Sequence, residues 1–179
     1  ANVWLDPNAP AGGRYKTQGE IYVSHHLKLL SSRSSQLQKV FRFSESHDGL
    51  QWRSFADLSN MGPIDSYTTI RWSTVAQRYH IYLRDYQPGW HHHYRCARRR
   101  TSRTAAFPLN SSDWVDERIV VCPDAVDNAT HGGGAVAQGG PPPVDFYGAT
   151  PFSVSGAKPG TLLMFVNRFW HTSGTCVPE

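Results

Sequence analysis

The sequence predicts an all-β fold built from repeated units of a few short strands. Aromatic residues make up 12% of the 179 residues, and runs of the helix-favouring residues Ala, Leu, Glu and Lys are scarce, which favours strands and turns. A short pattern also occurs three times: an Asp at the head of a strand-like run, an aromatic-rich strand and a polar hairpin. Repeats of this length are typical of propeller blades or stacked sheets, in which equivalent positions of successive units converge on one axis.

The three copies of the pattern begin at Asp6, Asp65 and Asp145. The first copy leads to residues 14–16, the second to residues 70–82 and the third to residues 162–166. Carboxylates at equivalent positions of successive blades would meet in one central cavity. We therefore expect these three Asp side chains to share one site.

Short strands separated by turn signals are expected along the whole chain. Asp48-Gly49 marks a tight hairpin, because both residues tolerate the positive φ that such a turn requires, and Trp52 is placed to cover the adjoining strand. Residues 124–143 are rich in Gly and Pro and cannot pack regularly, so we expect a long loop there, inside one domain that spans residues 1–179. The expected strands are residues 22–30, 40–43, 68–73, 79–84, 94–99 and 118–121.

The charge and hydropathy of the chain limit its partners. A hydrophobic content of 39% is enough for a core. Most of the net charge of +4 comes from residues 95–103, which form either a polyanion-binding patch or a strand with Arg at its outward positions. The strand is favoured because no nucleic-acid motif accompanies the charge, so we expect no nucleic-acid partner. No apolar run approaches the ~20 residues that cross a bilayer, so we expect a soluble protein with no membrane partner.

The cysteines and histidines indicate neither a metal site nor a cofactor. Cys96, Cys122 and Cys176 lack the C-x-x-C spacing of metal ligands, and one disulfide can form between a pair that the sequence does not identify. Residues 91–93 are consecutive histidines, but neighbouring side chains in a strand point to opposite faces and do not readily converge on one ion. The acceptor sequences for glycosylation at Asn110 and Asn128 matter only in a secreted protein, so the compartment stays open.

Taken in order, these motifs resemble the five-bladed β-propeller glycoside hydrolases of the invertase-like and arabinanase-like group. The similarity runs nearly end to end, and the resemblance implies an acidic central funnel that binds a sugar. Such a propeller needs about 300 residues, at ~55–70 residues per blade, so this chain holds about two and a half blades. The matching elements are Asp6 to Pro10 with Arg14-Tyr15-Lys16, Ser46-x-Asp48-Gly49-x-x-Trp52, Asp65-Ser66 with Arg78-Tyr79 and Arg84, Arg95 with Arg99 and Ser102, Trp114, Pro123-Asp124, and Asp145 to Gly148.

The resemblance also implies roles for particular side chains. Glycosidic cleavage needs two carboxyl groups in different protonation states, and we expect Asp6 as base or nucleophile, Asp65 as the group that raises a neighbouring pKa, and Asp145 as the acid. No Glu of the chain lies in a motif that matches the general acid of these enzymes. The expected sugar-binding residues are the aromatic side chains Trp72, Trp90, Tyr147 and Trp170, which offer stacking surfaces, and Arg71 and Arg84, which reach hydroxyl groups or pair with the Asp residues.

Three functions follow from this resemblance and stay open. In the first, the chain is a propeller module that binds a carbohydrate and hydrolyses a glycosidic bond. In the second, the module has the same fold but lacks the general-acid residue, and it only binds carbohydrate. The third alternative is a structural subunit whose incomplete propeller is completed by another protein chain, which would bury its open blade edges.

Overall fold

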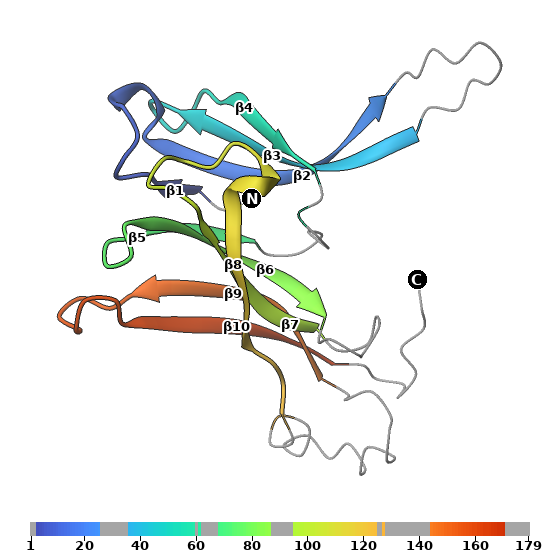
Figure 1. Ribbon diagram of the computed structural model, residues 1–179, viewed down its shortest axis with the longest axis vertical. Coiled ribbons are helices and arrows are strands. Elements are labelled where there is room, and N and C mark those ends of the chain that lie inside the picture. Colours follow the sequence, from blue (N-terminus) through green and yellow to red (C-terminus); the bar gives the residue numbers. More distant parts are fainter. Residues whose placement is uncertain are drawn as a thin grey trace.

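The computed structural model describes residues 3–25, 36–59, 61, 68–86, 95–124, 127 and 144–170. These residues form three antiparallel sheets of four, four and two strands (Figure 1). The predicted all-β class is confirmed. No helix in the described part of the chain is long and apolar enough to cross a membrane.

The first sheet contains β1 (Val3–Leu5), β2 (Tyr15–His25), β3 (Gln36–Ser46) and β4 (Arg53–Leu58), paired in chain order. A short 3-10 turn, η1 (Ala11–Gly13), precedes β2. Strand β3 alternates as a half-buried strand does: Phe41 and Phe43 point inward and are buried, while Arg42 on the other face pairs with Asp57 at 2.7 Å. The predicted hairpin joins β3 to β4, and Gly49 in its turn has φ 80°.

The second sheet contains β5 (Thr69–Ser73), β6 (Arg78–Tyr86), β7 (Arg95–Ser102) and β8 (Trp114–Val121), again paired in chain order. The 3-10 turn η2 (Ser111–Asp113) precedes β8. Every residue of β6 from Tyr79 to Arg84 is buried. A strand buried on both faces must be covered on both sides, which places this sheet in the middle of the molecule.

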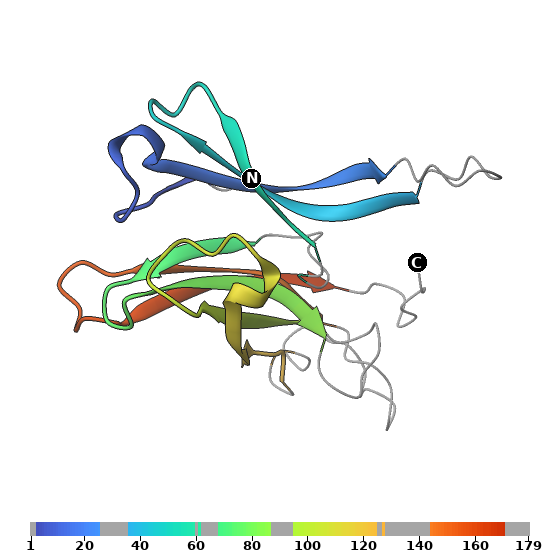
Figure 2. The ribbon, with the colours of Figure 1, turned by 45° about the horizontal axis from the view of Figure 1, so that its top comes forward.

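The third sheet is a hairpin of β9 (Val144–Ser153) and β10 (Leu162–Trp170). Strand β9 contacts β5, β6 and β7, and its Val144, Phe146 and Ala149 are buried. Figure 1 shows the three sheets one below another, and Figure 2 shows the first sheet as a separate layer over the other two. The sheets therefore pack in chain order, with the second between the first and the third.

The main core lies between the first and second sheets. Phe43 meets Phe41 and Phe107 edge to face, with ring centroids 5.1 Å and 5.2 Å apart, an arrangement that aromatic pairs prefer. Phe107 in turn contacts Tyr79 at 5.0 Å. The buried residues of this cluster are Phe41, Phe43, Leu58, Met61, Ile70, Tyr79, Ile81, Leu83 and Trp114.

Two features of β7 answer questions that the sequence left open. Cys96 on β7 forms a disulfide with Cys122, which directly follows β8. The Arg-rich segment is a strand, as the favoured alternative predicted: Arg98 pairs with Asp85 at 2.7 Å on one neighbouring strand, and Arg100 pairs with Glu117 at 2.6 Å on the other. Much of its positive charge is thus matched within the sheet.

The predicted loop at 124–143 lies almost wholly outside the described residues.

Candidate functional site

A cavity of about 850 Å³ opens where the first and second sheets meet. Its walls come from the end of β1 and the turn after it, the start of β2, the β3–β4 turn, and β5 with the turn that follows it. Aromatic and charged side chains dominate the lining: Trp4, Tyr15, Trp72, Asp6, Arg14, His47, Asp48 and Arg71. This volume and mixture of apolar walls with a few polar groups are typical of small-molecule sites.

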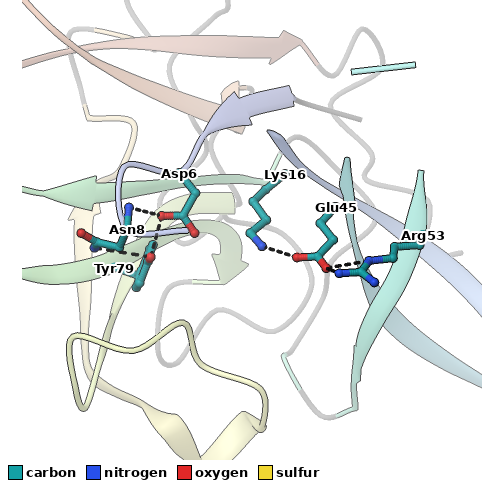
Figure 3. Close-up of polar contacts among 6 residues, drawn as sticks. All are labelled: Asp6, Asn8, Lys16, Glu45, Arg53 and Tyr79. Atoms are coloured by element: carbon teal, nitrogen blue, oxygen red, sulfur yellow. Dashed lines mark hydrogen bonds and ion pairs between the residues drawn. The ribbon is translucent and has the colours of Figure 1, made fainter. Parts of the chain in front are cut away.

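Asp6 is the buried carboxylate of this cavity and is 4% exposed. Its Oδ1 accepts a 2.7 Å hydrogen bond from the Tyr79 hydroxyl and a 3.0 Å bond from the backbone N–H of Asn8 (Figure 3). The bond to Asn8 makes Asp6 the first residue of an Asx turn. Burial, together with the neighbouring Asp6, raises the pKa of Tyr79 above its ordinary value. Tyr79 therefore stays protonated and fixes the carboxylate in place.

Asp48 brings a second carboxylate to the cavity, from the β3–β4 turn. Its Oδ1 accepts hydrogen bonds from the backbone N–H groups of Gln51 and Leu50 and from the Ser46 hydroxyl, at 2.8–2.9 Å. These donors lower the pKa of Asp48 to about 2, because hydrogen bonds to a carboxylate favour its charged form. The same bonds hold the turn in shape.

Two guanidinium groups, of Arg14 and Arg71, also line the cavity. Arg71 donates a 2.5 Å hydrogen bond to the hydroxyl of Ser153 on β9. The guanidinium carbon of Arg14 lies 5.7 Å from the ring centroid of Tyr15. Within the described ranges neither group forms an ion pair with a carboxylate.

Among the sequence-predicted site residues, Asp6, Arg71 and Trp72 come together in this cavity. The ring of Trp72 packs against the ring of Tyr79 in an edge-to-face arrangement, with the two ring centroids 4.9 Å apart. The Trp72 ring therefore has one side packed in the core and contributes to the cavity wall.

Asp145 and Arg84 lie elsewhere. Asp145 is fully buried on β9, where its Oδ1 accepts the backbone N–H of Arg95 at 3.0 Å and its Oδ2 pairs with the Arg95 guanidinium at 3.2 Å. This pair joins the third sheet to the start of β7. Arg84 is buried on β6 opposite Ala97. Neither Asp145 nor Arg84 is among the cavity-lining residues.

The other predicted site residues are Asp65, Trp90, Tyr147 and Trp170. Asp65 and Trp90 lie outside the described residues, as do the side chains of Tyr147 and Trp170. Sequence reasoning did not assign Trp4, Arg14, His47 or Asp48 to the site. Arg14 and Asp48 do belong to motifs that carry the family resemblance, but no local sequence signal indicates that the β3–β4 turn lies against the end of β1.

A second polar cluster lies on neighbouring positions of β2 and β3. Lys16 is buried and its Nζ lies 2.6 Å from Glu45 Oε2, while Arg53 on β4 pairs with Oε1 of the same carboxylate (Figure 3). A Cβ atom on Gly13 would lie 2.5 Å from Glu45 Oε2, so a larger residue at this position would displace the Glu45 carboxylate. This cluster stabilises the strand pair that carries Tyr15 into the cavity.

No group of three or more metal-ligating side chains gathers in the part of the chain that the structure describes. The consecutive histidines at 91–93 fall outside it.

Comparison with known proteins finds no matching family model, no matching curated protein and no matching solved structure. The fold and site define this protein as a layered, antiparallel all-β protein with an aromatic and charged cavity between its first and second sheets.

Proposed function

We propose that this protein is a carbohydrate-binding module, with the sugar held in the cavity lined by Asp6, Arg71 and Trp72. The observation that carries the proposal is the combination, in one cavity, of aromatic walls with fixed hydrogen-bonding groups. An aromatic ring matches the apolar C–H face of a pyranose. A few oriented charged groups then select among hydroxyl patterns.

The proposed architecture is a partial propeller of the five-bladed type that the sequence resembles. It is supported by the sheet sizes, since two four-stranded sheets and a two-stranded hairpin correspond to two blades and half of a third. Each sheet also pairs its strands in chain order and packs on the next sheet, as successive blades do. A closed ring would need further blades from additional sequence or from another chain.

A second chain is supported by the outer face of β10, where Leu163 and Phe165 are 52% and 69% exposed. The stacked rings of Phe165 and Phe152 lie 4.9 Å apart and would suit a further blade packed against them. A mass in solution of more than one chain supports this arrangement, whereas a strictly monomeric mass at all concentrations argues against it.

Hydrolysis is the second candidate, because Asp6 and Asp48 bring two carboxylates to one cavity. Glycoside cleavage needs one of the two groups to be protonated near neutral pH. Asp48, with its pKa of about 2, can serve only as a base. Binding is therefore favoured over cleavage. If the protein released reducing ends from an oligosaccharide and Asp6→Asn abolished that release, cleavage would become the favoured function.

Carbohydrate binding can be tested by titrating the protein with oligosaccharides in a calorimeter. Replacing Trp72 with Leu keeps an apolar side chain but removes the stacking surface. We expect about tenfold weaker binding, the loss of roughly 1.4 kcal/mol from one aromatic contact.

The matched control is Trp52→Leu, because Trp52 is 37% exposed on the hairpin and does not line the cavity. Both variants are first checked for folding by circular dichroism. Equal affinity in wild type and a folded Trp72→Leu variant, or no binding to any oligosaccharide, would refute the proposal.

A further inference from the structure

We infer that the cavity selects an acidic sugar, one that carries a carboxylate such as a uronic acid residue, and that Arg14 and Arg71 bind this carboxylate. The inference rests on the proposed carbohydrate-binding function and specifies its ligand class.

The two carboxylates of the cavity are engaged by protein donors. Asp6 accepts two hydrogen bonds on Oδ1 and is almost completely buried. Asp48 accepts three hydrogen bonds on Oδ1 within its own turn. Both carboxylates therefore hold the backbone that forms the cavity wall.

The two guanidinium groups are engaged far less. A guanidinium carries five N–H donors, and the contacts of Arg71 in the described residues include one hydrogen bond, to the Ser153 hydroxyl. Arg14 is exposed, and its contact is with the face of Tyr15. Most of these donors therefore have no partner among the described residues and can reach a ligand.

Several arginines elsewhere in the molecule have a carboxylate partner. Arg42 pairs with Asp57, Arg98 and Arg100 with Glu117, and Arg168 with Asp127, at distances of 2.5–2.9 Å. Among the described residues, Arg14 and Arg71 lack a carboxylate partner such as these four arginines have. A ligand carboxylate would supply it, because the planar fork of arginine matches a carboxylate through two parallel hydrogen bonds.

The aromatic walls restrict the ligand further. Trp4, Tyr15 and Trp72 line the same cavity as the two arginines. A small inorganic anion would leave these rings without a partner, whereas a pyranose that carries a carboxylate uses both the rings and the arginines. A sugar acid is therefore the ligand chemistry that this lining fits best.

The experiment compares paired oligosaccharides that differ only in the C6 group: glucose with glucuronate, galactose with galacturonate, and mannose with mannuronate oligomers. Affinities are measured by calorimetry at about 0.05 M and 0.5 M salt, with sulfated oligosaccharide as a further probe. We expect at least one acidic member to bind about tenfold more tightly than its neutral partner and to retain binding at high salt. Charge-assisted hydrogen bonds of this kind are strong enough for such a difference.

The variants Arg14→Gln and Arg71→Gln are each expected to weaken acidic-sugar binding about tenfold and to weaken neutral-sugar binding much less, so that the preference for the acidic member of each pair falls. Arg14 is exposed, so Arg14→Gln is expected to fold. It therefore tests the inference even if Arg71→Gln is destabilised by losing the hydrogen bond to Ser153. The matched control is Arg78→Gln, on the strand paired with β5 at Ser73, because Arg78 does not line the cavity and bonds only the carbonyl of Gln77 among the described residues.

The outcomes separate this inference from the proposed function. If neutral and acidic sugars bound equally well, or if both Arg variants still bound acidic sugars with wild-type affinity, the inference would be overturned. The proposed carbohydrate-binding function would stand in either case. Preference for the sulfated probe would overturn the assignment of a carboxylate. Failure of every sugar to bind would overturn both.

Discussion

Lys16 shows how this fold accommodates a buried charge. Its side chain is 6% exposed, and its ammonium group lies 2.6 Å from Glu45 and 4.5 Å from the ring centroid of Phe55. Burial alone raises the pKa of Glu45, but the hydrogen bonds from Lys16 and Arg53 outweigh it, so the pKa lies below its ordinary value. An ammonium ion can stay buried here because a carboxylate and an aromatic face replace its water.

Replacing Glu45 with Gln should therefore lower the free energy of unfolding by about 3 kcal/mol at pH 7, since it leaves the Lys16 charge buried without its partner. Because the folded-state pKa of Glu45 is depressed, its contribution is fully present above the unfolded-state pKa of about 4.3 and is lost as the pH falls through the folded-state value. Urea unfolding between pH 7 and pH 3 should show this loss in the wild type and not in Glu45→Gln.

Asp57→Asn is the matched control for that measurement. It breaks the Arg42–Asp57 pair, in which both side chains are 37% exposed, and exposed pairs contribute less than about 1 kcal/mol. If Glu45→Gln cost no more than Asp57→Asn, the buried cluster would contribute nothing particular to stability.

Single residues were also where sequence reasoning was least able to assign roles. Asp6 and Asp145 carry the same side chain in the same repeated pattern, yet one lines the cavity and the other is buried against Arg95. Their partners lie far along the chain: Tyr79 is 73 residues from Asp6, and Arg95 is 50 residues from Asp145. A role that depends on such distant neighbours leaves no local trace.

At the scale of elements, local signals were reliable. The Asp48-Gly49 turn is confirmed because everything that forms it lies within six residues: the Ser46 and Asp48 side chains cap the turn and Gly49 supplies the positive φ. The strand pair expected at 68–73 and 79–84 is observed as β5 and β6. Strand β1 has only three residues and was not predicted, because so short a run cannot show an alternating pattern.

The disulfide is the element-scale feature with the clearest energetic consequence. Cys96 and Cys122 are 26 residues apart, and closing a loop of that length in the unfolded chain stabilises the fold by about 3–4 kcal/mol in the chain-entropy model. The double variant Cys96→Ser/Cys122→Ser should lose about this much stability in urea unfolding and should no longer respond to reductant. Cys176→Ser, as control, should keep the wild-type response; a wild type indifferent to reductant would contradict the bond.

The whole molecule depends on packing between layers, which the repeats alone do not define. The three Asp-headed repeats fall one in or beside each sheet, since each sheet is contiguous in sequence. They could not say which faces meet. The cavity arises only because the end of β1 and the β3–β4 turn of the first sheet lie against β5 of the second, and that contact is set by the buried aromatic cluster between them.

Phe43 is the residue through which this layer contact can be tested. Its side chain is completely buried between the first and second sheets, against Phe41, Phe55 and Phe107. Phe43→Ala should lower the free energy of unfolding by about 3–5 kcal/mol, through lost burial and the space left behind. The cavity takes its walls from both sheets, so the same variant should also weaken sugar binding, although it substitutes none of the lining residues.

Phe165→Ala is the control, since Phe165 is 69% exposed on β10 and its loss should cost well below the Phe43 value. Unfolding is followed both by circular dichroism, which reports all three sheets, and by tryptophan fluorescence. If the layers form one cooperative unit, the two transitions coincide in the wild type. If the two probes instead gave separate transitions, and sugar binding were lost in only one of them, the first and second sheets could form without each other. The cavity would then depend on a weaker contact than the aromatic core.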